Sequence, residues 1–408
     1  MSEYTATIMP PSTRANSRKA AIVGVGETDY GIDYKAARAR LPGYEPPSLE
    51  HLIGTAFEQA LADAGLTRAD IDGLSVSYIY GGPTPPETAA ILGLEPGYMI
   101  QNGGLMAGPL PIVCADIAAG KADTVVMIYA APSRSINRRY GGATYGAAQE
   151  GTPASYYYYH PWGWSSQAAH WALIATRYLA LYGATEEDLG AVAMQLRRNA
   201  AATPNAVMQA PMTLSDYMNS RYIVRPLRLF DMCMVNDGAV CLIVRRADLA
   251  ADMLHTPVLV AGWGEAKVKH DKMRALVGER LRPQMQAAGR EALDMAGIAS
   301  SDIGHLEGYD AASIHLVNQV EGFGFTEPGT ALAAFRNGDF AAGGGKLGVN
   351  TAGGTMSGSY LHGWNQIVEV VHQLRHEAGP RQVPGVRASM SCVAQTDQIH
   401  PIIYTRGG

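Results

Sequence analysis

Short apolar runs alternate along the chain with longer segments in which apolar residues recur every three or four positions. The short runs predict buried strands, and the longer segments predict amphipathic helices. Strands are expected at 19–25, 73–79, 124–129, 239–245, 258–262, 305–309, 387–392 and 399–404. Helices are expected at 48–64, 105–119, 165–182, 185–202, 282–296, 311–321 and 357–377, the last containing a strong core at 364–375. Strands that alternate with helices favour an α/β fold, with helices on the faces of a mixed sheet.

The chain contains an internal repeat. The phrase AIVGVGE at 21–27 returns as VLVAGWGE at 258–265, and the following helices end alike, in ADAGL and DMAGI. Glycines after a helix commonly adopt the left-handed conformation that ends it, so Gly65 and Gly297 are expected to do so. We therefore expect two duplicated halves, at 19–256 and 257–408. Residues 1–18 are expected to be a disordered lead-in, and 131–228 an insertion into the first half.

Composition narrows the classes of function. The chain has 408 residues, 47% of them hydrophobic and 17% charged, which fits a well-buried globular protein. A net charge of −5 without a basic run argues against a nucleic-acid partner. No apolar run reaches membrane-spanning length, and no membrane association is expected. The four cysteines show no CxxC spacing, which fits the cytoplasm and argues against a disulfide framework or a metal site.

A glycine-rich stretch at 350–363 (NTAGGTMSGSYLHG) carries the main chemical signal. So many glycines do not suit a regular helix or strand, which predicts a tight turn before the helix at 364–375. Backbone N–H groups at such a place stabilise negative charge. Tyr360 and His362 within the stretch suggest proton transfer beside a developing anion. The Gly24-x-Gly26 pair lacks the full dinucleotide fingerprint, so no nicotinamide cofactor is expected, and no other cofactor is expected in this chain.

Three motifs occur in a fixed order on this duplicated frame: GGLM at 103–106, followed by AAGKADTVV at 118–126; VNDGA at 235–239; and Asn-x-x-Gly-Gly at 350–354. Together they resemble the thiolase superfamily, within its sterol-carrier-protein-X-type branch, over nearly all of the chain from residue 19. The resemblance implies the thiolase fold: two mixed-sheet halves layered as α/β/α/β/α. It also implies a coenzyme A thioester as substrate and a homodimer.

The chain departs from the thiolase pattern at the chemical positions. Where thiolases place the nucleophilic cysteine this chain has Gln101, which cannot form a thioester intermediate. Tyr360 stands at the place of the thiolase histidine, and Tyr309 opens the loop that replaces the Asn-Glu-Ala-Phe loop. Cys392 matches the position of the acid/base cysteine.

These departures resemble a sub-branch, the thiolase-like aldolases that remove side chains from steroid-CoA thioesters. That resemblance implies that Tyr309 and Tyr360 act as acid and base, with His362 and Cys392 in the same site. It also implies a small partner protein built from a zinc ribbon and an OB fold. Residues expected to bind substrate or an oxyanion are Gln101, Gly103, Gly104, Asn350, Gly353 and Gly354.

Retro-aldol cleavage of a β-hydroxyacyl thioester is consistent with these residues, because it needs no covalent enzyme intermediate. A phenol with a pKa of about 10 costs about 4 kcal/mol to ionise at pH 7, so its surroundings must favour the phenolate. Helix ends and His362 are expected to help. Two alternatives stay open: a divergent thiolase or acyltransferase that uses Cys392, and a non-catalytic subunit that binds CoA esters.

Several of these residues also have structural interpretations. Tyr360 could be a packing residue at a helix start, and Tyr78, the repeat mate of Tyr309, suggests that a tyrosine at this strand end can be structural. Asp310 is expected to cap the helix at 311–321. Asn236 and its neighbour Asp237 are expected to fix a turn. The tyrosine run at 156–159 is expected to be a packed loop, or else an aromatic wall for a bulky substrate.

Overall fold

The computed structural model describes residues 9–39, 43–78, 81–138, 160–162, 164, 166–267, 278–394 and 398–408. The tyrosine run at 156–159 and the first eight residues of the expected lead-in lie outside this part. In the described residues, no helix has both the length and the apolar character needed to cross a membrane.

The same strand order occurs in both halves of the main sheet, as the repeat predicts. The strands are β1 (Ala20–Glu27), β2 (Gly73–Ser77), β3 (Tyr98–Gln101), β4 (Thr124–Pro132), β7 (Asp237–Arg246), β8 (Val258–Trp263), β9 (Ala266–Lys267), β10 (His305–Gly308), β11 (Gly348–Val349), β12 (Ala388–Ala394) and β13 (Gln398–Arg406). The first half has the order β1-β7-β4-β2-β3, and the second half repeats it as β8-β13-β12-β10-β11. The halves meet where β1 pairs briefly with β8, Ala21 opposite Leu259 and Ile22 opposite Val258.

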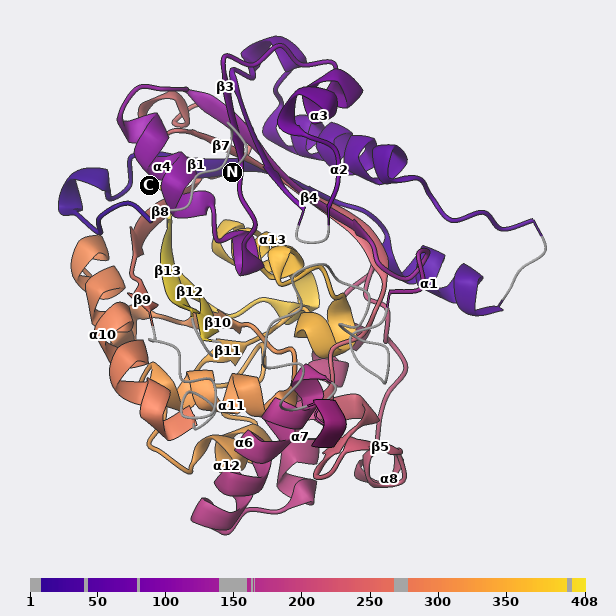
Figure 1. Ribbon diagram of the computed structural model, residues 1–408. Coiled ribbons are helices and arrows are strands. Elements are labelled where there is room, and N and C mark those ends of the chain that lie inside the picture. Colours follow the sequence, from indigo (N-terminus) through magenta and orange to yellow (C-terminus); the bar gives the residue numbers. More distant parts are fainter. Residues whose placement is uncertain are drawn as a thin grey trace.

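Helices cover both halves and fill the space between them (Figure 1). They are α1 (Tyr30–Ala39), α2 (Leu49–Ala64), α3 (Pro85–Leu92), α4 (Leu110–Ala118), α6 (Gln167–Tyr182), α7 (Glu186–Ala201), α8 (Leu214–Met218), α10 (Gly278–Ala296), α11 (Ser313–Gly322), α12 (Ala331–Asn337) and α13 (Trp364–Arg375). Helix α2 packs on β1, β4 and β7, whereas α10 packs on β8 and β13. Helix α13 contacts strands of both halves and forms the middle layer. This is the expected α/β/α/β/α arrangement.

The repeated G-x-G phrase has a packing role in each half. A Cβ at Gly24 or Gly26 would lie 2.5 Å and 2.1 Å from carbonyl oxygens of α2. The same atom at Gly262 or Gly264 would lie 2.2 Å and 2.1 Å from carbonyl oxygens of α10. Only glycine lets each helix approach its strand this closely, which accounts for the motif without a nucleotide.

The predicted C-terminal ends of α2 and α10 are confirmed. Gly65 and Gly297 end α2 and α10 with φ values of 65° and 67°. After each glycine an aspartate fixes the next turn: Asp70 and Asp302 accept N–H groups three residues earlier, both at 2.8 Å. The two halves therefore share cap chemistry as well as strand order.

Two predicted helices are wrong at their N-terminal ends. The segment 105–119 is a 3₁₀ turn at Leu105–Ala107 followed by α4, because Met106 and Ala107 have positive φ values. The segment 357–377 becomes a helix only at Trp364, as its core at 364–375 predicts. Before that residue, Gly354–Gly358 form one wide π-helical turn and the chain then extends. The short strands β3 and β11 have no counterpart in the sequence prediction.

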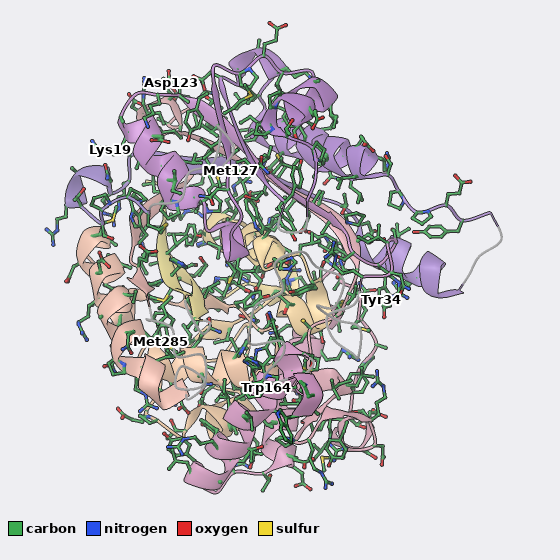
Figure 2. The ribbon with its side chains drawn as sticks, in the orientation of Figure 1. Lys19, Tyr34, Asp123, Met127, Trp164 and Met285 are labelled. Atoms are coloured by element: carbon green, nitrogen blue, oxygen red, sulfur yellow. The ribbon has the colours of Figure 1, made fainter. Side chains whose placement is uncertain are left out.

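Part of the expected lead-in contacts the first strand of the second half. The Oγ of Ser17 donates to the carbonyl of Ala261 at 2.6 Å, and the indole N–H of Trp263 donates to the carbonyl of Pro10 at 3.1 Å. Residues 10–18 therefore lie along β8. The larger of the two buried hydrophobic clusters includes Met127 on β4 and Met285 on α10, both labelled in Figure 2.

The described parts of the insertion lie over the second half. Helices α6 and α7 pack on α11, and α7 also packs on α12. A small hairpin of β5 (Tyr222–Val224) and β6 (Leu227–Arg228) lies beside α6. The insertion thus covers the helices that follow the strand ends where Tyr309 lies.

Candidate active site

Two tyrosines from separate loops meet in the interior. Tyr309 directly follows β10, and Tyr360 lies in the loop that leads into α13. Their hydroxyl oxygens are 3.1 Å apart, within hydrogen-bonding distance. The two residues are only 2% and 6% exposed. The structure therefore brings together the two residues that the sequence marks as acid and base.

The main chain on both sides of Tyr309 is fixed by hydrogen bonds. Its N–H donates to the carbonyl of Cys392 at 2.9 Å, and its carbonyl accepts from Nε2 of Gln319 at 2.7 Å. The amide of Asn350 accepts from the N–H of Gly308 at 2.8 Å and donates to its carbonyl at 2.9 Å. Asn350, expected to bind substrate, thus joins the glycine-rich loop to the end of β10.

Tyr360 is fixed by Asn236, which lies just before β7. The side-chain oxygen of Asn236 accepts the N–H of Tyr360 at 2.7 Å, and its Nδ2 donates to Oγ of Ser359 at 2.9 Å. Asn236 was expected to fix a local turn. Its Nδ2 does donate locally, to the carbonyl of Asp237 at 3.0 Å, but Asn236 also anchors a loop more than 120 positions further along the chain, beside the phenol pair.

His362 lies next to Tyr360 and is paired with Tyr129 of β4. The rings of His362 and Tyr360 have centroids 4.6 Å apart, and the hydroxyl of Tyr129 shares a hydrogen bond with Nδ1 of His362. The ring of Tyr129 is stacked on that of Trp364, with the ring centroids 5.6 Å apart. Burial, assisted by the positive charge of Arg138, lowers the pKa of His362 to about 3. The imidazole is therefore neutral at physiological pH and acts on its neighbours through hydrogen bonding rather than through charge.

The N–H groups of the glycine-rich loop do bind a carboxyl group, but that group belongs to the protein. The carboxyl of Asp310 accepts the N–H of Thr355 at 2.8 and 2.9 Å and the N–H of Met356 at 3.3 Å. Gly354 has φ 57°, and a Cβ there would lie 2.2 Å from Asp310 Oδ2. The expectation that Asp310 caps α11 is wrong, since Ala312 occupies the N-cap position. Burial outweighs the N–H donors and raises the pKa of Asp310 to about 7.

The loop after β3 reaches the same place. The carbonyl of Gly104 accepts the indole N–H of Trp364 at 3.0 Å, and the N–H of Met106 donates to the carbonyl of His362 at 2.8 Å. Gln101 ends β3 and is half-buried. A long helix does not begin directly after Gly104, because α4 starts only at Leu110. Substrate binding by Gln101, Gly103 and Gly104 stays a prediction.

Gly353 and Cys392 are enclosed by neighbouring elements. Gly353 has φ 93° and packs so closely on α7 that a Cβ would lie 2.6 Å from that of Ala200. Cys392 is fully buried, and its thiol donates to Oε1 of Gln319 at 3.6 Å. Burial raises the pKa of this thiol, which disfavours the thiolate that a nucleophile needs. Among the described residues, no three His, Cys, Asp or Glu side chains are grouped to hold a metal ion.

Sequence reasoning missed Tyr129, the anchoring role of Asn236, and Arg138. A weak signal exists for the first, since Tyr129 is the only aromatic residue in the apolar run TVVMIYAAP. Arg138 lies six residues after the end of that strand and belongs to no motif that points to the site. Its effect on His362 depends on how the chain folds back over the site.

Comparisons with known proteins identify relatives of this chain. Residues 266–396 match the family described as thiolase C-terminal domain-like. The chain is 33% identical over 374 residues to a 17-hydroxy-3-oxo-4-pregnene-20-carboxyl-CoA lyase of Mycobacterium tuberculosis, covering 88% of this chain and 92% of that protein. It is 33% identical over 376 residues to a steroid side-chain-cleaving aldolase of Thermomonospora curvata, covering 87% and 90%.

A solved structure extends the likeness to three dimensions. The Ltp2-ChsH2(DUF35) aldolase superposes with a TM-score of 0.81 at 29% identity, covering 98% of this chain and 99% of that one. The duplicated strand order, the glycine-rich loop and these relatives lead to one assignment. The chain belongs to the thiolase superfamily, in its branch of thiolase-like aldolases.

Proposed function

We propose that this enzyme cleaves the Cα–Cβ bond of a β-hydroxyacyl-CoA thioester, with Tyr309 and Tyr360 as its acid–base pair. The products are a ketone or aldehyde and a shorter acyl-CoA. The observation that carries this proposal is the 3.1 Å contact between two buried phenol hydroxyls at the meeting point of the site loops. Gln101 at the nucleophile position excludes the cysteine chemistry of thiolases there.

Cleavage of the Cα–Cβ bond needs no reactant beyond the substrate and the two tyrosines. One tyrosine, as phenolate, takes the proton of the β-hydroxyl, and the electrons of the broken C–C bond pass into the thioester as an enolate. The other tyrosine gives its hydroxyl proton to the α-carbon. At that point the two phenols have exchanged protonation states. Because their oxygens lie 3.1 Å apart, one proton transfer between them restores the starting state.

Arg138 and His362 favour the ionised form of a phenol in this buried site. Arg138 is close enough to disfavour a second positive charge on His362, and the same guanidinium favours a negative charge nearby. Neutral His362, oriented by Tyr129, can hydrogen-bond in the site without competing for the proton. We propose that Arg138 provides the charge and that His362 and Tyr129 position Tyr360.

The two relatives of 33% identity are named for steroid substrates, which supports a steroid or similarly bulky acyl group here. The solved relative is named as a complex with a DUF35 component. We propose a partner of that type, expected from the family resemblance to combine a zinc ribbon with an OB fold, and a homodimer of this chain. Coenzyme A enters as part of the substrate, and no resident cofactor is proposed.

The test compares three tyrosine-to-phenylalanine variants. Tyr360→Phe and Tyr309→Phe should each lower kcat at least about 100-fold, the usual range for removing an acid or base. Tyr178→Phe, which removes a buried hydroxyl bonded to Glu321 on α11, is the matched control and should keep its activity. Mass spectrometry would follow the shorter acyl-CoA released from a panel of β-hydroxyacyl-CoAs, with and without a DUF35 partner. Full activity in either site variant would refute the assignment, and a trapped acyl-enzyme would favour the thiolase alternative.

A further inference from the structure

The chain enters β7 beside the phenol pair through two consecutive polar residues, Asn236 and Asp237. They are only 0% and 5% exposed. The side-chain oxygen of Asn236 accepts the N–H of Tyr360 at 2.7 Å. Asp237 is bonded to a different segment, the turn that follows β4. Two loops that reach the site are therefore held from one point of the chain.

The carboxylate of Asp237 fixes the first half of that turn. Its Oδ1 accepts the N–H groups of Arg134 at 2.7 Å and Ser135 at 3.0 Å. Its Oδ2 accepts the same N–H of Ser135 at 3.1 Å and also the hydroxyl of Ser135. The turn then closes on itself, because the N–H of Arg138 donates to the carbonyl of Ser133 at 2.8 Å. Asp237 therefore helps to determine where the main chain of Arg138 lies.

The two arginines of this turn have different surroundings. The guanidinium of Arg134 lies over the ring of Tyr34 on α1, 4.0 Å from its centroid. Burial, and after it the charge of Arg138, lower the pKa of His362, whose ring centroid lies 4.6 Å from that of Tyr360. Arg138 is thus the cation of the turn whose charge reaches the site.

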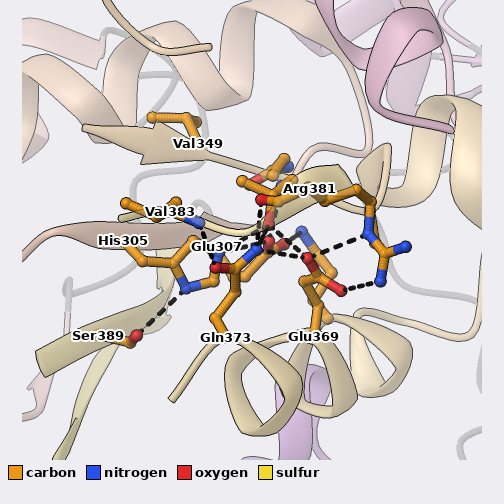
Figure 3. Close-up of polar contacts among 12 residues, drawn as sticks. His305, Glu307, Val349, Glu369, Gln373, Arg381, Val383 and Ser389 are labelled. Carbon is orange, nitrogen blue, oxygen red and sulfur yellow. Dashed lines mark hydrogen bonds and ion pairs between the residues drawn. The ribbon is translucent and has the colours of Figure 1, made fainter. Parts of the chain in front are cut away.

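The charged groups beneath β10 are already bonded to one another (Figure 3). Nε2 of His305 lies 3.1 Å from Oε1 of Glu307, and Arg381 donates to Glu369 at 2.8 Å. These pairs add no unbalanced positive charge for a phenolate. Other titratable groups on the elements around the phenols are Tyr129 on β4, Arg197 on α7, Cys233 before β7, Asp310 after β10 and Cys392 on β12.

We propose that Asp237 is a positioning residue of the cleavage reaction, which acts by placing Arg138 beside the phenol pair. The inference rests on the proposed function of the two tyrosines. Asn236 holds a phenol and Asp237 holds the cation, so the start of β7 sets the distance between them. Because the attraction between opposite charges weakens with distance, a loosened turn would favour the phenolate less.

The experiment measures kcat/KM against pH for the parent, Asp237→Asn, Arg138→Met and the double variant. The fall of kcat/KM at low pH reports protonation of the base in the free enzyme. Asp237→Asn keeps the size of the side chain but replaces one of two accepting oxygens by an NH₂ group. The midpoint of the fall should rise by about one pH unit in Asp237→Asn and at least as much in Arg138→Met. The double variant should rise no further than Arg138→Met alone.

The sign of the shift separates positioning from a direct charge effect. Loss of a nearby negative charge lowers the pKa of a phenol, so removal of the carboxylate charge alone would move the midpoint down. Asp72→Asn is a matched control, because Asp72 holds the other end of β4 by accepting the N–H groups of Asp123 at 2.8 Å and Thr124 at 2.7 Å. Asp72→Asn and Arg134→Met should both leave the midpoint unchanged.

Ser135→Ala keeps the test decisive if Asp237→Asn does not fold. It removes an exposed hydroxyl that donates to Asp237, and it should raise the midpoint by a smaller amount, but not when Arg138→Met is also present. The proposal is overturned if Asp237→Asn lowers kcat/KM equally at every pH, or if its shift adds to that of Arg138→Met. Failure of the proposed function would appear separately, as full activity in Tyr309→Phe or Tyr360→Phe.

Discussion

Asp310→Asn makes a sharp test of the electrostatics of the site, because two effects oppose each other at this residue. Its carboxyl accepts N–H groups of Thr355 and Met356, which favour the ionised form. It is also fully buried, which favours the protonated form. The balance raises its pKa from 3.8 to about 7. Asparagine has nearly the same shape but does not titrate.

The size of the effect follows from linkage. Between about pH 4 and pH 7 the folded state holds a proton on Asp310 that the unfolded chain has released. Stability is therefore lost as pH rises, at about 1.4 kcal/mol for each pH unit. Over the whole interval this amounts to about 4 kcal/mol, present below the unfolded pKa and gone above pH 7.

The assay is urea unfolding of the parent and of Asp310→Asn at pH 5, 6, 7 and 8. Subtracting the two free energies of unfolding cancels the titrating groups that do not interact with Asp310. The parent should lose stability relative to the variant from pH 5 to pH 7, and the difference should then level off. A difference that stays constant, or that rises with pH, would show that the N–H groups of the loop win and that Asp310 is ionised in the folded state.

Two further predictions concern packing and positioning. Tyr129→Phe keeps the stacking on Trp364 but removes the hydroxyl that shares a hydrogen bond with Nδ1 of His362. The value of kcat should therefore fall about tenfold to a hundredfold with KM little changed, and an unchanged kcat would remove Tyr129 from the site. Gly26→Ala should lower the free energy of unfolding by about 1–3 kcal/mol, because its Cβ would clash with α2. Gly54→Ala places its Cβ in open space on the same helix and should raise the free energy of unfolding by about 0.5–1 kcal/mol. Similar urea midpoints for the two variants would contradict this reasoning.

The site was only partly accessible to sequence reasoning. Spacing from Asn350 identified Tyr360, and the loop replacing a thiolase motif identified Tyr309. The sequence could not show that their hydroxyls touch, because a contact between residues 51 positions apart depends on how two strand-end loops converge. It placed His362 beside the phenols but could not show that burial lowers the pKa of the imidazole to about 3 and keeps it neutral.

Local rules determined much of the fold from the sequence alone. Apolar strand runs, helix periodicity and the glycines that end α2 and α10 depend on neighbours within one element, so they can be read directly. The repeat added the duplication, because similar phrases in both halves fold alike.

Tertiary structure decided what depends on burial and on distant partners. Asp310 is expected from the sequence to cap α11, and the N–H groups of the glycine-rich loop are expected to face a ligand. In the structure the carboxyl of Asp310 accepts those N–H groups. Helices α4 and α13 begin later than predicted, at Leu110 and Trp364, because nearby residues adopt positive φ values to reach across the site. Hydrogen bonding and desolvation at such points are set by the whole surroundings of a group. The sequence therefore predicted which residues carry the chemistry, and only the folded chain decided how they are paired, charged and oriented.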